Sequence, residues 1–573
     1  MSPNVTNGSD QQQAGHYPSS SSSGPIRRTK GSSTARNMTN LQVGDRVHAK
    51  WGGNGCWYLA AVNAISTSGR RVTVDWDDGD TSDRTVEARD VCKVSDESTP
   101  STEAEIDAIS YVDELPGKGR CLFVRNFTKA GGVLFIERPL LVSVPSKYPA
   151  LWAALSAANE VEPVALGTTT FHFAALLSWL CLNDTDLKKI VDKFAPDEET
   201  STVSRDAERL LELLPPFLNH DGAAAAIGVR PEIVRFTMPT PQYMQALLSA
   251  WRYNSFGHHG EEGLVLYHRI SMAAHGCDPT CCWTYGDEDS FVLRARVTLE
   301  PGAELTLSYL QDDDLLRATN IRRQKLENWK FHCLCNRCLI MVDTCRGFRC
   351  LKCRSGAHYY IEHPPDDLKE HVSGPDLEVD SGADVFMSPT NSPTGGSNKN
   401  RRSLLTPCEV CGEVCREAEE KQCLDLEPDY IQRIENLDKD NIHDIELVYN
   451  ASLDFFHDMH WCLFACDQLI WQYYRDRDPV LALMHQEKKV NYHSRAYPRP
   501  TFVWAWGLEE LADSMQKSPN AFERPSRVAQ MMNLYRKAQC QLGILCGPGH
   551  PYAIGPQNKW HAAQQKFSEL MNK

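Results

Sequence analysis

Cysteines at short spacing are the residues of this chain most able to do chemistry. The stretch "CLCNRC" supplies three thiols, Cys333, Cys335 and Cys338. Thiolates at such spacing bind Zn²⁺, and a site closed by four protein ligands leaves no open position for catalysis. Buried free thiols are the alternative interpretation. The spacing favours a structural zinc site that fixes a short segment of the chain.

A second group of cysteines lies further along the chain. "CLKC" and "CEVC" are two CxxC pairs that could close a second zinc site, with the ligands Cys350, Cys353, Cys408 and Cys411. Their separation is longer than in a usual zinc ribbon, and the low-complexity residues 364–403 explain it as an inserted loop. Any one ligand could be replaced by another nearby thiol, namely Cys345, Cys415 or Cys423.

Regions of different composition and hydrophobic pattern follow one another along the chain and must position these cysteines. Residues 1–40 are rich in Ser, Gly, Gln and Asn, so we expect disorder there and in the loop 364–403. Residues 41–95 alternate apolar and polar side chains between Gly and Asp turns, which predicts a small β-barrel. Residues 104–340 mix strand-like segments ("RCLFVRNF", "SFVLRARV", "AELTLSYL") with helical ones ("FHFAALLSWLCL", "RDAERLLELL").

The C-terminal part, residues 425–573, is predicted to be helical. "IHDIELVYNASLDFFHDMHWCLFACDQLIWQYY" and "SRVAQMMNLYRKAQCQLGILCG" repeat apolar residues at three-to-four spacing, and the latter ends at Gly547, a C-cap signal. Stacked antiparallel helices of the tetratricopeptide (TPR) type fit this pattern, although no clean 34-residue repeat is visible. The fold class is therefore multidomain α+β.

Charge and composition limit the partners. The chain of 573 residues has a formal net charge of −15, which argues against attraction to nucleic acid or to an anionic membrane and favours basic partners such as lysine-rich proteins. No apolar run is long enough to span a membrane, and the polar N-terminus does not resemble a secretory signal. We therefore expect a reducing compartment, in which the 21 cysteines favour zinc over disulfides.

Four separated stretches occur in an informative order. They are "GKGRCLFVRNFTKAGGVLFIERPLL", "WRYNSFG", "SMAAHGCDPTCCWTY", and "LEPGAELTLSYL" followed by "RRQKLENWKFHCLCNRC". Together they resemble the SET domain of the SET-and-MYND (SMYD) protein-lysine methyltransferases, and the likeness covers about residues 104–573. It implies a SET β-fold at 104–340 with a helical insertion at about 141–250, a zinc-bound post-SET region at 341–424, and a C-terminal helical bundle. The family's zinc-binding MYND insertion is not expected, because residues 141–230 carry a single cysteine, Cys181.

The resemblance also implies roles for individual residues. S-adenosylmethionine would be the methyl donor, Tyr309 the catalytic tyrosine beside the transferred methyl group, and Trp329 a wall of the lysine channel. Cys277 would be the fourth thiolate of the first zinc site. The residues implied in cofactor binding are Gly117, Lys118, Gly119, Arg120, Asn254, Ala274, His275 and Phe331.

The chain departs from the family pattern inside the cofactor motif. Ala274 stands where the family has a cofactor-binding asparagine, and one lost buried hydrogen bond costs roughly 1–3 kcal/mol, or about 5- to 150-fold in affinity. Thr280 replaces a second asparagine and Gly276 a serine, so we expect a looser local crossing of the chain. A catalytically weak or inactive SET scaffold is therefore the alternative to an active enzyme.

The predicted N-terminal barrel also has a likeness. "LQVGDRVHAKWGGNGCWYLAAV" with "RRVTVDWDDGDTSDRTV" resembles a Tudor domain, which implies a cage for methylated lysine formed by Trp51, Tyr58, Trp76 and Asp78. Aromatic faces attract such a soft cation through their quadrupole. One position departs, because Asp80 stands where an aromatic residue is common. The alternative is that these aromatics only fill a small barrel.

These features predict an S-adenosylmethionine-dependent protein-lysine N-methyltransferase with a Tudor-like reader. Its partners would be a lysine-containing protein, histone or not, and a methylated-lysine peptide at the barrel, with no direct nucleic-acid or membrane contact. We expect it in the nucleus, the cytoplasm or both, since "GPIRRTK" and "NKNRRS" are too short to decide.

Overall fold

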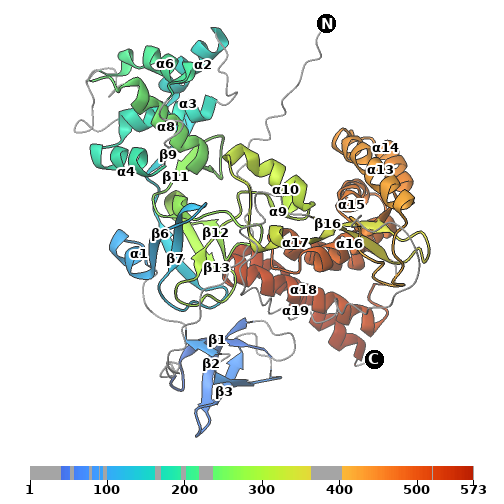
Figure 1. Ribbon diagram of the computed structural model, residues 1–573. Helices are drawn as coiled ribbons and strands as arrows, with labels where there is room; N and C mark the ends of the chain where they lie inside the picture. Colours follow the sequence, from blue (N-terminus) through green and yellow to red (C-terminus); the bar gives the residue numbers. More distant parts are fainter. Residues whose placement is uncertain are drawn as a thin grey trace. The chain divides into compact units, whose positions relative to one another are not determined.

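The computed structural model describes residues 41–51, 57–76, 81–88, 91–93, 100–161, 169–194, 202–218, 237–362, 403–518 and 521–571 (Figure 1). These residues belong to two compact units. The first contains residues 97–275 and 279–307, and the second contains residues up to 96, the short segment 276–278 and residues 308–573. The predicted disorder at 1–40, most of the predicted loop at 364–403 and the position of Asp78 lie outside the described residues.

Three small antiparallel sheets form the β-part of the first unit. One joins β6 (Ser110–Leu115), β7 (Gly119–Val124) and β14 (Glu304–Leu305) in the order β14-β7-β6. A second has the order β12-β13-β8 and contains β8 (Val133–Glu137), β12 (Cys281–Tyr285) and β13 (Phe291–Ala295). The third, β10-β11-β9, contains β9 (Leu141–Ser143), β10 (Phe256–Gly257) and β11 (Leu264–Leu266). Residues distant in sequence therefore share sheets.

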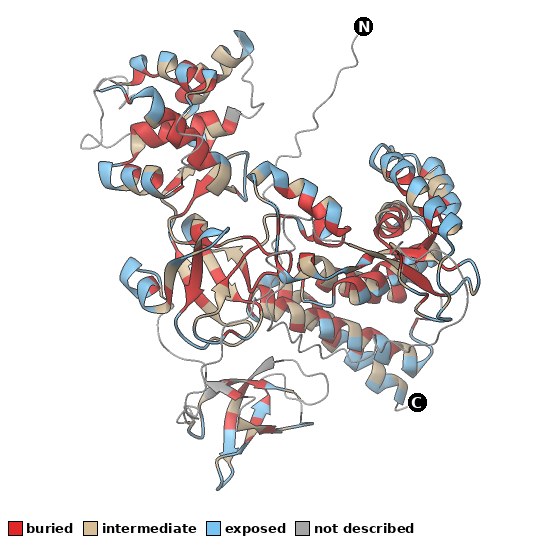
Figure 2. Ribbon diagram, viewed as in Figure 1, coloured by how far each residue is buried: buried red, intermediate tan, exposed pale blue. Residues whose placement is uncertain are grey.

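Helices fill the predicted insertion of the first unit. They are α2 (Pro149–Val161), α3 (Thr169–Cys181), α4 (Asp184–Phe194), α6 (Arg205–Leu213) and α8 (Pro241–Asn254), preceded by the short α1 (Glu103–Ile109). The helix α3 is buried along most of its length and joins one apolar core with α8 and the strands (Figure 2). The indole of Trp251 donates a hydrogen bond of 2.6 Å to Ser178 inside this core. The predicted helices in "FHFAALLSWLCL" and "RDAERLLELL" are thereby confirmed.

The second unit begins with a five-stranded antiparallel sheet. Its order is β4-β3-β2-β1-β5, with β1 (Arg46–Lys50), β2 (Trp57–Ile65), β3 (Arg71–Trp76), β4 (Thr85–Glu87) and β5 (Val91–Lys93). Alternate residues of β3 are fully buried, which gives the sheet one apolar face of small valines and alanines. Short strands are therefore present where the sequence predicted them.

A second sheet of this unit connects the cysteine-rich region to helices. The strand β15 (Val342–Arg349) lies between β16 (Ala357–Ile361) and β17 (Phe456–His460). Before it come the short helices α9 (Asp312–Leu315), α10 (Thr319–Leu326) and α11 (Asn336–Leu339) and the 3₁₀ turn η7 (Glu327–Trp329). The strand β17 corrects a prediction, because the residues 442–474 were expected to be continuously helical. "FHDM" is recruited into the sheet instead, where Phe456 stacks on His460.

Seven helices follow or flank this sheet. They are α13 (Glu417–Glu435), α14 (Ile442–Ser452), α15 (Trp461–Tyr474), α16 (Pro479–Ala496), α17 (Phe502–Lys517), α18 (Pro525–Leu545) and α19 (Pro551–Met571). Buried and exposed residues alternate along α18 and α19, as expected of amphipathic helices (Figure 2). The helix α13 begins at Glu417, before the predicted start at residue 425, and α18 ends just before Gly547 as predicted. The TPR type of the bundle stays a prediction.

Within the described residues, every helix is too short or too polar to cross a lipid bilayer.

Candidate cofactor and zinc-binding site

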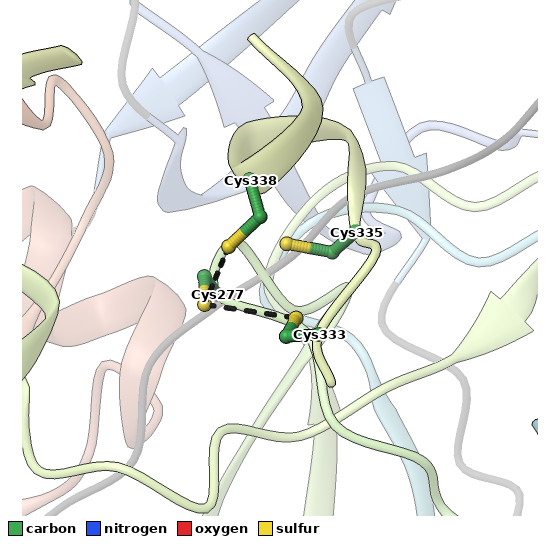
Figure 3. A group of neighbouring side chains, drawn as sticks. All are labelled: Cys277, Cys333, Cys335 and Cys338. Carbon is green, nitrogen blue, oxygen red and sulfur yellow. Dashed lines mark hydrogen bonds between the residues drawn. The ribbon is translucent and has the colours of Figure 1, made fainter. Parts of the chain in front are cut away.

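Four cysteines of the second unit converge at one point (Figure 3). Cys277 comes from the segment 276–278, Cys333 and Cys335 from the chain after η7, and Cys338 from α11. The Cys277 sulfur lies 3.9 Å from that of Cys333 and 3.5 Å from that of Cys338. Zn–S bonds of about 2.3 Å arranged as a tetrahedron place sulfur atoms about 3.8 Å apart, whereas a disulfide needs about 2.05 Å. The four donors therefore fit a structural Zn²⁺ ion.

Arginine side chains surround this buried cluster. Four thiolates and one Zn²⁺ leave two negative charges, which are costly in a site that excludes water. The guanidinium of Arg322 is 1% exposed and donates to the Cys338 sulfur at 3.8 Å and to the Thr319 hydroxyl at 3.0 Å. Arg323 donates to the Cys338 carbonyl at 2.9 Å, and Arg337 to the Cys277 carbonyl at 3.2 Å.

The charges of the cluster and of Arg322 stabilise one another. Burial lowers the pKa of the Arg322 guanidinium, but the negative charges of Cys338 and Cys277 outweigh burial and raise it well above its usual value. Hydrogen bonds from Cys277, Cys333 and Cys335 hold the pKa of the Cys338 thiol well below its ordinary value. Hydrogen bonds with Cys277 raise the pKa of the Cys333 and Cys335 thiols, so the four thiols share protons that Zn²⁺ binding would release.

The predicted catalytic tyrosine, the predicted channel tryptophan and the predicted cofactor-binding phenylalanine pack on the same cluster. The ring of Tyr309 lies 5.6 Å from that of Trp329 and 6.2 Å from that of Phe331, the latter edge to face. All three are half-buried against the apolar core that the four cysteines form with Leu310, Leu315 and Leu326. Lys330, between the two partner rings, adopts a left-handed backbone with φ of 57°, which reverses the chain there. The four-cysteine cluster is thus part of the apolar packing around Tyr309.

Tyr309 itself corrects one expectation. "AELTLSYL" was predicted to be a strand through the tyrosine, but β14 ends at Leu305. Leu307 then bridges to His275, and Ser308 donates a side-chain hydrogen bond to the Leu310 carbonyl in a tight turn. Leu310, directly after this turn, belongs to the apolar cluster of the four cysteines, so Tyr309 packs on that cluster and lies outside the sheet.

The second cysteine group lies at the surface of its unit. The sulfur atoms of Cys350 and Cys411 are 3.7 Å apart, as are those of Cys353 and Cys408, so this group also fits tetrahedral zinc. Cys411 is exposed and Cys353 is half-buried. Gly356 is required at its place, because a Cβ atom there would lie 2.5 Å from the Cys408 sulfur. Lys352 of the first CxxC loop forms an exposed ion pair with Glu413, two residues after Cys411.

The glycine-rich turn of the first unit lies between β6 and β7. Gly117 and Gly119 have φ of 74° and 71°, a left-handed conformation that residues with a Cβ rarely adopt. Lys118 pairs with Glu304 of β14, with Nζ 2.8 Å from the carboxylate. Arg120, the second residue of β7, lies opposite Glu114 of β6. The Lys118 side chain is therefore engaged by Glu304, and it is the backbone of this turn that a ligand could approach closely.

Asn254 ends helix α8 and is anchored to the backbone. Its side-chain amide donates to the carbonyls of Phe194 at 3.0 Å and Ala250 at 2.9 Å. Its own carbonyl accepts a hydrogen bond from the Ser271 hydroxyl. The two donors are therefore committed, and the Oδ1 atom remains as an acceptor for an ammonium group such as that of a methionine moiety.

The motif around Ala274 is firmly tied to β14, contrary to the expected loose crossing. The Ala274 carbonyl accepts the Leu307 N–H at 3.0 Å, and His275, 4% exposed, forms a parallel bridge to Leu307. Thr280 and Thr306 exchange two hydrogen bonds of 2.9 Å. These bonds use backbone groups and the hydroxyls of Thr280 and Thr306, so the crossing is held without asparagine side chains. Ala274 still offers no side-chain hydrogen bond.

Glu137 binds the segment that precedes the Ala274 motif. Its carboxylate, at the end of β8, accepts backbone N–H groups of His268, Arg269 and Ile270 at 2.9, 2.5 and 2.8 Å. Burial raises the pKa of the Glu137 carboxyl to about 7, and the three N–H donors act in the opposite direction. This carboxylate positions the segment that leads to Ala274.

The predicted cage residues of the barrel have different environments. Trp76 is 6% exposed in the apolar core of the five-stranded sheet, and its indole donates to the Ser82 carbonyl at 3.0 Å. Trp51 is half-buried at the end of β1, with the guanidinium carbon of Arg536 4.9 Å from its ring. Asp78 and the side chain of Tyr58 lie outside the described residues. The barrel and its cage stay predictions, and Trp76 belongs to the apolar core of the sheet.

Sequence reasoning missed the arginines around the first zinc site. "RRQKLENWK" precedes "CLCNRC", and this run of basic residues is the signal that could have suggested charge compensation. This signal did not decide the matter, because arginines on a helix with so many charged residues usually lie at the surface.

Residues 119–310 of the chain match the SET domain family. This range contains β7 to β14, the motif at 274–275 and Tyr309, so the sequence likeness and the site geometry concern the same part of the molecule.

Similar curated proteins match over a short region. The human "Histone-lysine N-methyltransferase SMYD3" is 38% identical over 78 residues, which are 14% of this chain and 18% of the relative. The "SET and MYND domain-containing protein DDB_G0292454" of Dictyostelium discoideum is 34% identical over 79 residues, 14% of this chain and 22% of the relative. The chain thus spans about a fifth of the length of the curated relatives it matches.

Among solved structures, "Crystal structure of the SET domain of LSMT bound to Lysine and AdoHcy" aligns over 80% of this chain and 88% of that one, at 11% identity and a TM-score of 0.25. "Structure of Rubisco LSMT bound to AdoMet" aligns over 81% and 90%, at 10% identity and a TM-score of 0.23.

Proposed function

We propose that the chain is a protein-lysine N-methyltransferase that uses S-adenosylmethionine. The observation that carries the proposal is that Tyr309, inside the SET match, stands in an aromatic setting fixed by a four-cysteine cluster. The identity to histone-lysine and other SET-and-MYND proteins supports it. The substrate would be a lysine-containing protein, in keeping with the net charge of −15, and the site of action the nucleus or the cytoplasm.

The residues present fit the cofactor in their chemistry. The Oδ1 atom of Asn254 would accept the ammonium of the methionine part, and the left-handed turn at Gly117–Gly119 would approach its polar end through the backbone. The half-buried ring of Phe331 would stack on the adenine. When bound, the sulfonium supplies an electrophilic methyl group.

The chain's own contribution to transfer is positioning and desolvation. Lysine has a pKa of about 10.4 in water, so the site must favour the neutral amine, and apolar walls do this by penalising the charged form. Trp329 and Phe331 beside Tyr309 provide such walls. The Tyr309 hydroxyl would orient the amine nitrogen in line with the methyl group, which lowers the entropic part of the barrier.

A binding measurement tests the proposal at its weakest residue, Ala274. We expect the zinc-loaded full chain to bind S-adenosylmethionine in calorimetric titration with micromolar affinity, and Ala274→Asn to bind about 5- to 150-fold more tightly because it restores a hydrogen bond. Absence of binding by both proteins would overturn the proposal.

The second candidate is a SET scaffold without turnover, and the missing hydrogen bonds of Ala274 favour it. It predicts that only Ala274→Asn binds the cofactor.

For the barrel we propose a reader of methylated lysine. Trp51 supports it, because its ring already faces a cation in this structure. Because Trp76 is buried, a methylated lysine would have to bind on the side of the barrel where Trp51 lies.

A further inference from the structure

Helix α18 contacts the barrel of the same unit through the guanidinium of Arg536. The guanidinium carbon of Arg536 lies 4.9 Å from the ring centroid of Trp51 and 4.5 Å from that of Trp560 on α19. Arg536 is 6% exposed, although it is a charged residue on a helix. A guanidinium is planar and weakly hydrated, and it loses less than an ammonium when it leaves water for aromatic faces.

A second residue of α18 makes the same contact independently. Cys540 is one helical turn after Arg536, so both side chains point to the same side of α18. Cys540 is 6% exposed and belongs to the apolar cluster of the barrel core, together with Val47, Val74 and Trp76. A cation and an apolar side chain on one helix face therefore contact the barrel, one at Trp51 and one at its core.

We propose that helix α18 is an internal ligand of the barrel, with the Arg536 guanidinium occupying the aromatic face of Trp51. This face is the one on which a methylated lysine would bind, so the barrel is closed by its own chain until an external cation competes or Arg536 is removed. The docking rests on the contacts of Arg536 and Cys540. The class of the competing ligand, a methylammonium, rests on the reader function proposed above.

Cys540 is a built-in reporter of this contact. We would treat the zinc-loaded full chain with N-ethylmaleimide and follow each cysteine by peptide mass spectrometry. Cys546 is the internal reference, because it is 3% exposed at the end of the same helix and its thiol donates to the Leu542 carbonyl rather than to the barrel.

Removing the cation should open the contact. We expect Arg536→Gln to raise the alkylation rate of Cys540 by at least about tenfold while Cys546 stays protected, because two cation–π contacts are lost. The matched control is Lys537→Gln, which removes the same charge from the exposed side of the same helix and should change neither rate. An unchanged Cys540 rate in Arg536→Gln would overturn the proposal.

A variant on the barrel side covers the case in which Arg536→Gln disturbs the helices and both thiols react. Trp51→Ala leaves α18 and α19 intact, and we expect it to expose Cys540 alone. If Cys540 stays protected in Trp51→Ala, the barrel is not docked through this face and the proposal is wrong.

A peptide with one trimethyllysine, beside its unmethylated twin, separates docking from reading. We expect the methylated peptide to bind Arg536→Gln at least about tenfold more tightly than the native chain and to accelerate Cys540 alkylation in the native chain. If Cys540 opens in Arg536→Gln but neither peptide binds, the docking stands and the reader function is contradicted.

Discussion

The two four-cysteine clusters have the same ligands but different surroundings. In both, all four sulfur atoms lie within 4.8 Å of one another, and the sulfur pairs in contact are 3.5–3.9 Å apart. The first, around Cys277, is buried and contacted by Arg322, while the second includes the exposed Cys411 and is flanked by the surface pair Lys352–Glu413. Water can offset the charge of the second, but the first depends on protein cations. We therefore expect the buried cluster to be coupled to the fold and the site, and the surface cluster to be locally independent.

Replacing one ligand in each cluster should show the largest difference. We expect Cys338→Ser to lose one zinc per chain, to unfold the surroundings of Tyr309 and to lower the melting temperature by roughly 10 °C or more, because binding energy of a structural zinc is folding energy. Cys411→Ser should lose the other zinc with a much smaller shift. Metal analysis and thermal unfolding by circular dichroism measure both.

Equal shifts in the two variants would contradict the assignment of different roles. Fewer than two zinc ions per native chain would contradict the two-site interpretation itself.

Removing a nearby cation should have the next largest effect. Arg322→Met leaves the thiolate cluster buried without its charge partner, and we expect a loss of roughly 3–5 kcal/mol in unfolding free energy, as for broken buried ion pairs. The matched change at the surface cluster, Lys352→Met, should stay within about 0.5 kcal/mol. Urea unfolding of the two variants gives these values. A cost of less than about 1 kcal/mol for Arg322→Met would mean that its charge does not stabilise the cluster.

The buried carboxylate of Glu427 provides a third test of how protein groups stabilise a buried negative charge. Burial alone would raise the pKa of Glu427, but hydrogen bonds from His460 and Arg346 hold it at about 2. Because this pKa lies below the ordinary 4.5, the stabilisation is present above pH 4.5 and is lost as the pH falls toward 2. We expect a loss of about 3 kcal/mol over that range.

The native chain should be compared with Glu427→Gln at each pH, because zinc release affects both proteins equally. The stability difference between them should shrink as the pH falls. A difference that is independent of pH between 4.5 and 2 would show that Glu427 is not charged in the fold.

The sequence predicted the clusters better than their environment. CxxC spacing is local, so the chain itself places Cys350 with Cys353 and Cys333 near Cys335. Cys277 lies 56 residues before Cys333, and only the family resemblance supplied it. The contacts of Arg322 depend on how α10 packs on the cluster, which no local pattern records.

Two predictions about local structure were wrong because contacts between distant segments decide the outcome. The apolar spacing of residues 442–474 suits a helix, but β15 offers an open edge to which Phe456–His460 pairs as β17. The crossing at Ala274 was expected to be loose because two asparagines are missing. The hydroxyl of Thr280 bonds to Thr306, a residue 26 positions away, and this partner appears only when the strands are in register. Tertiary pairing thus decided both positions.

Turnover with Tyr309→Phe tests the central claim most directly. We would measure S-adenosylhomocysteine formed from S-adenosylmethionine by the zinc-loaded full chain with purified core histones and with a histone-free protein extract as acceptors. The account predicts product from the native chain and at least about a hundredfold less from Tyr309→Phe, while cofactor binding is unchanged, because the hydroxyl only orients the reacting amine. Equal rates in both proteins, or no product from either even with Ala274→Asn, would contradict it.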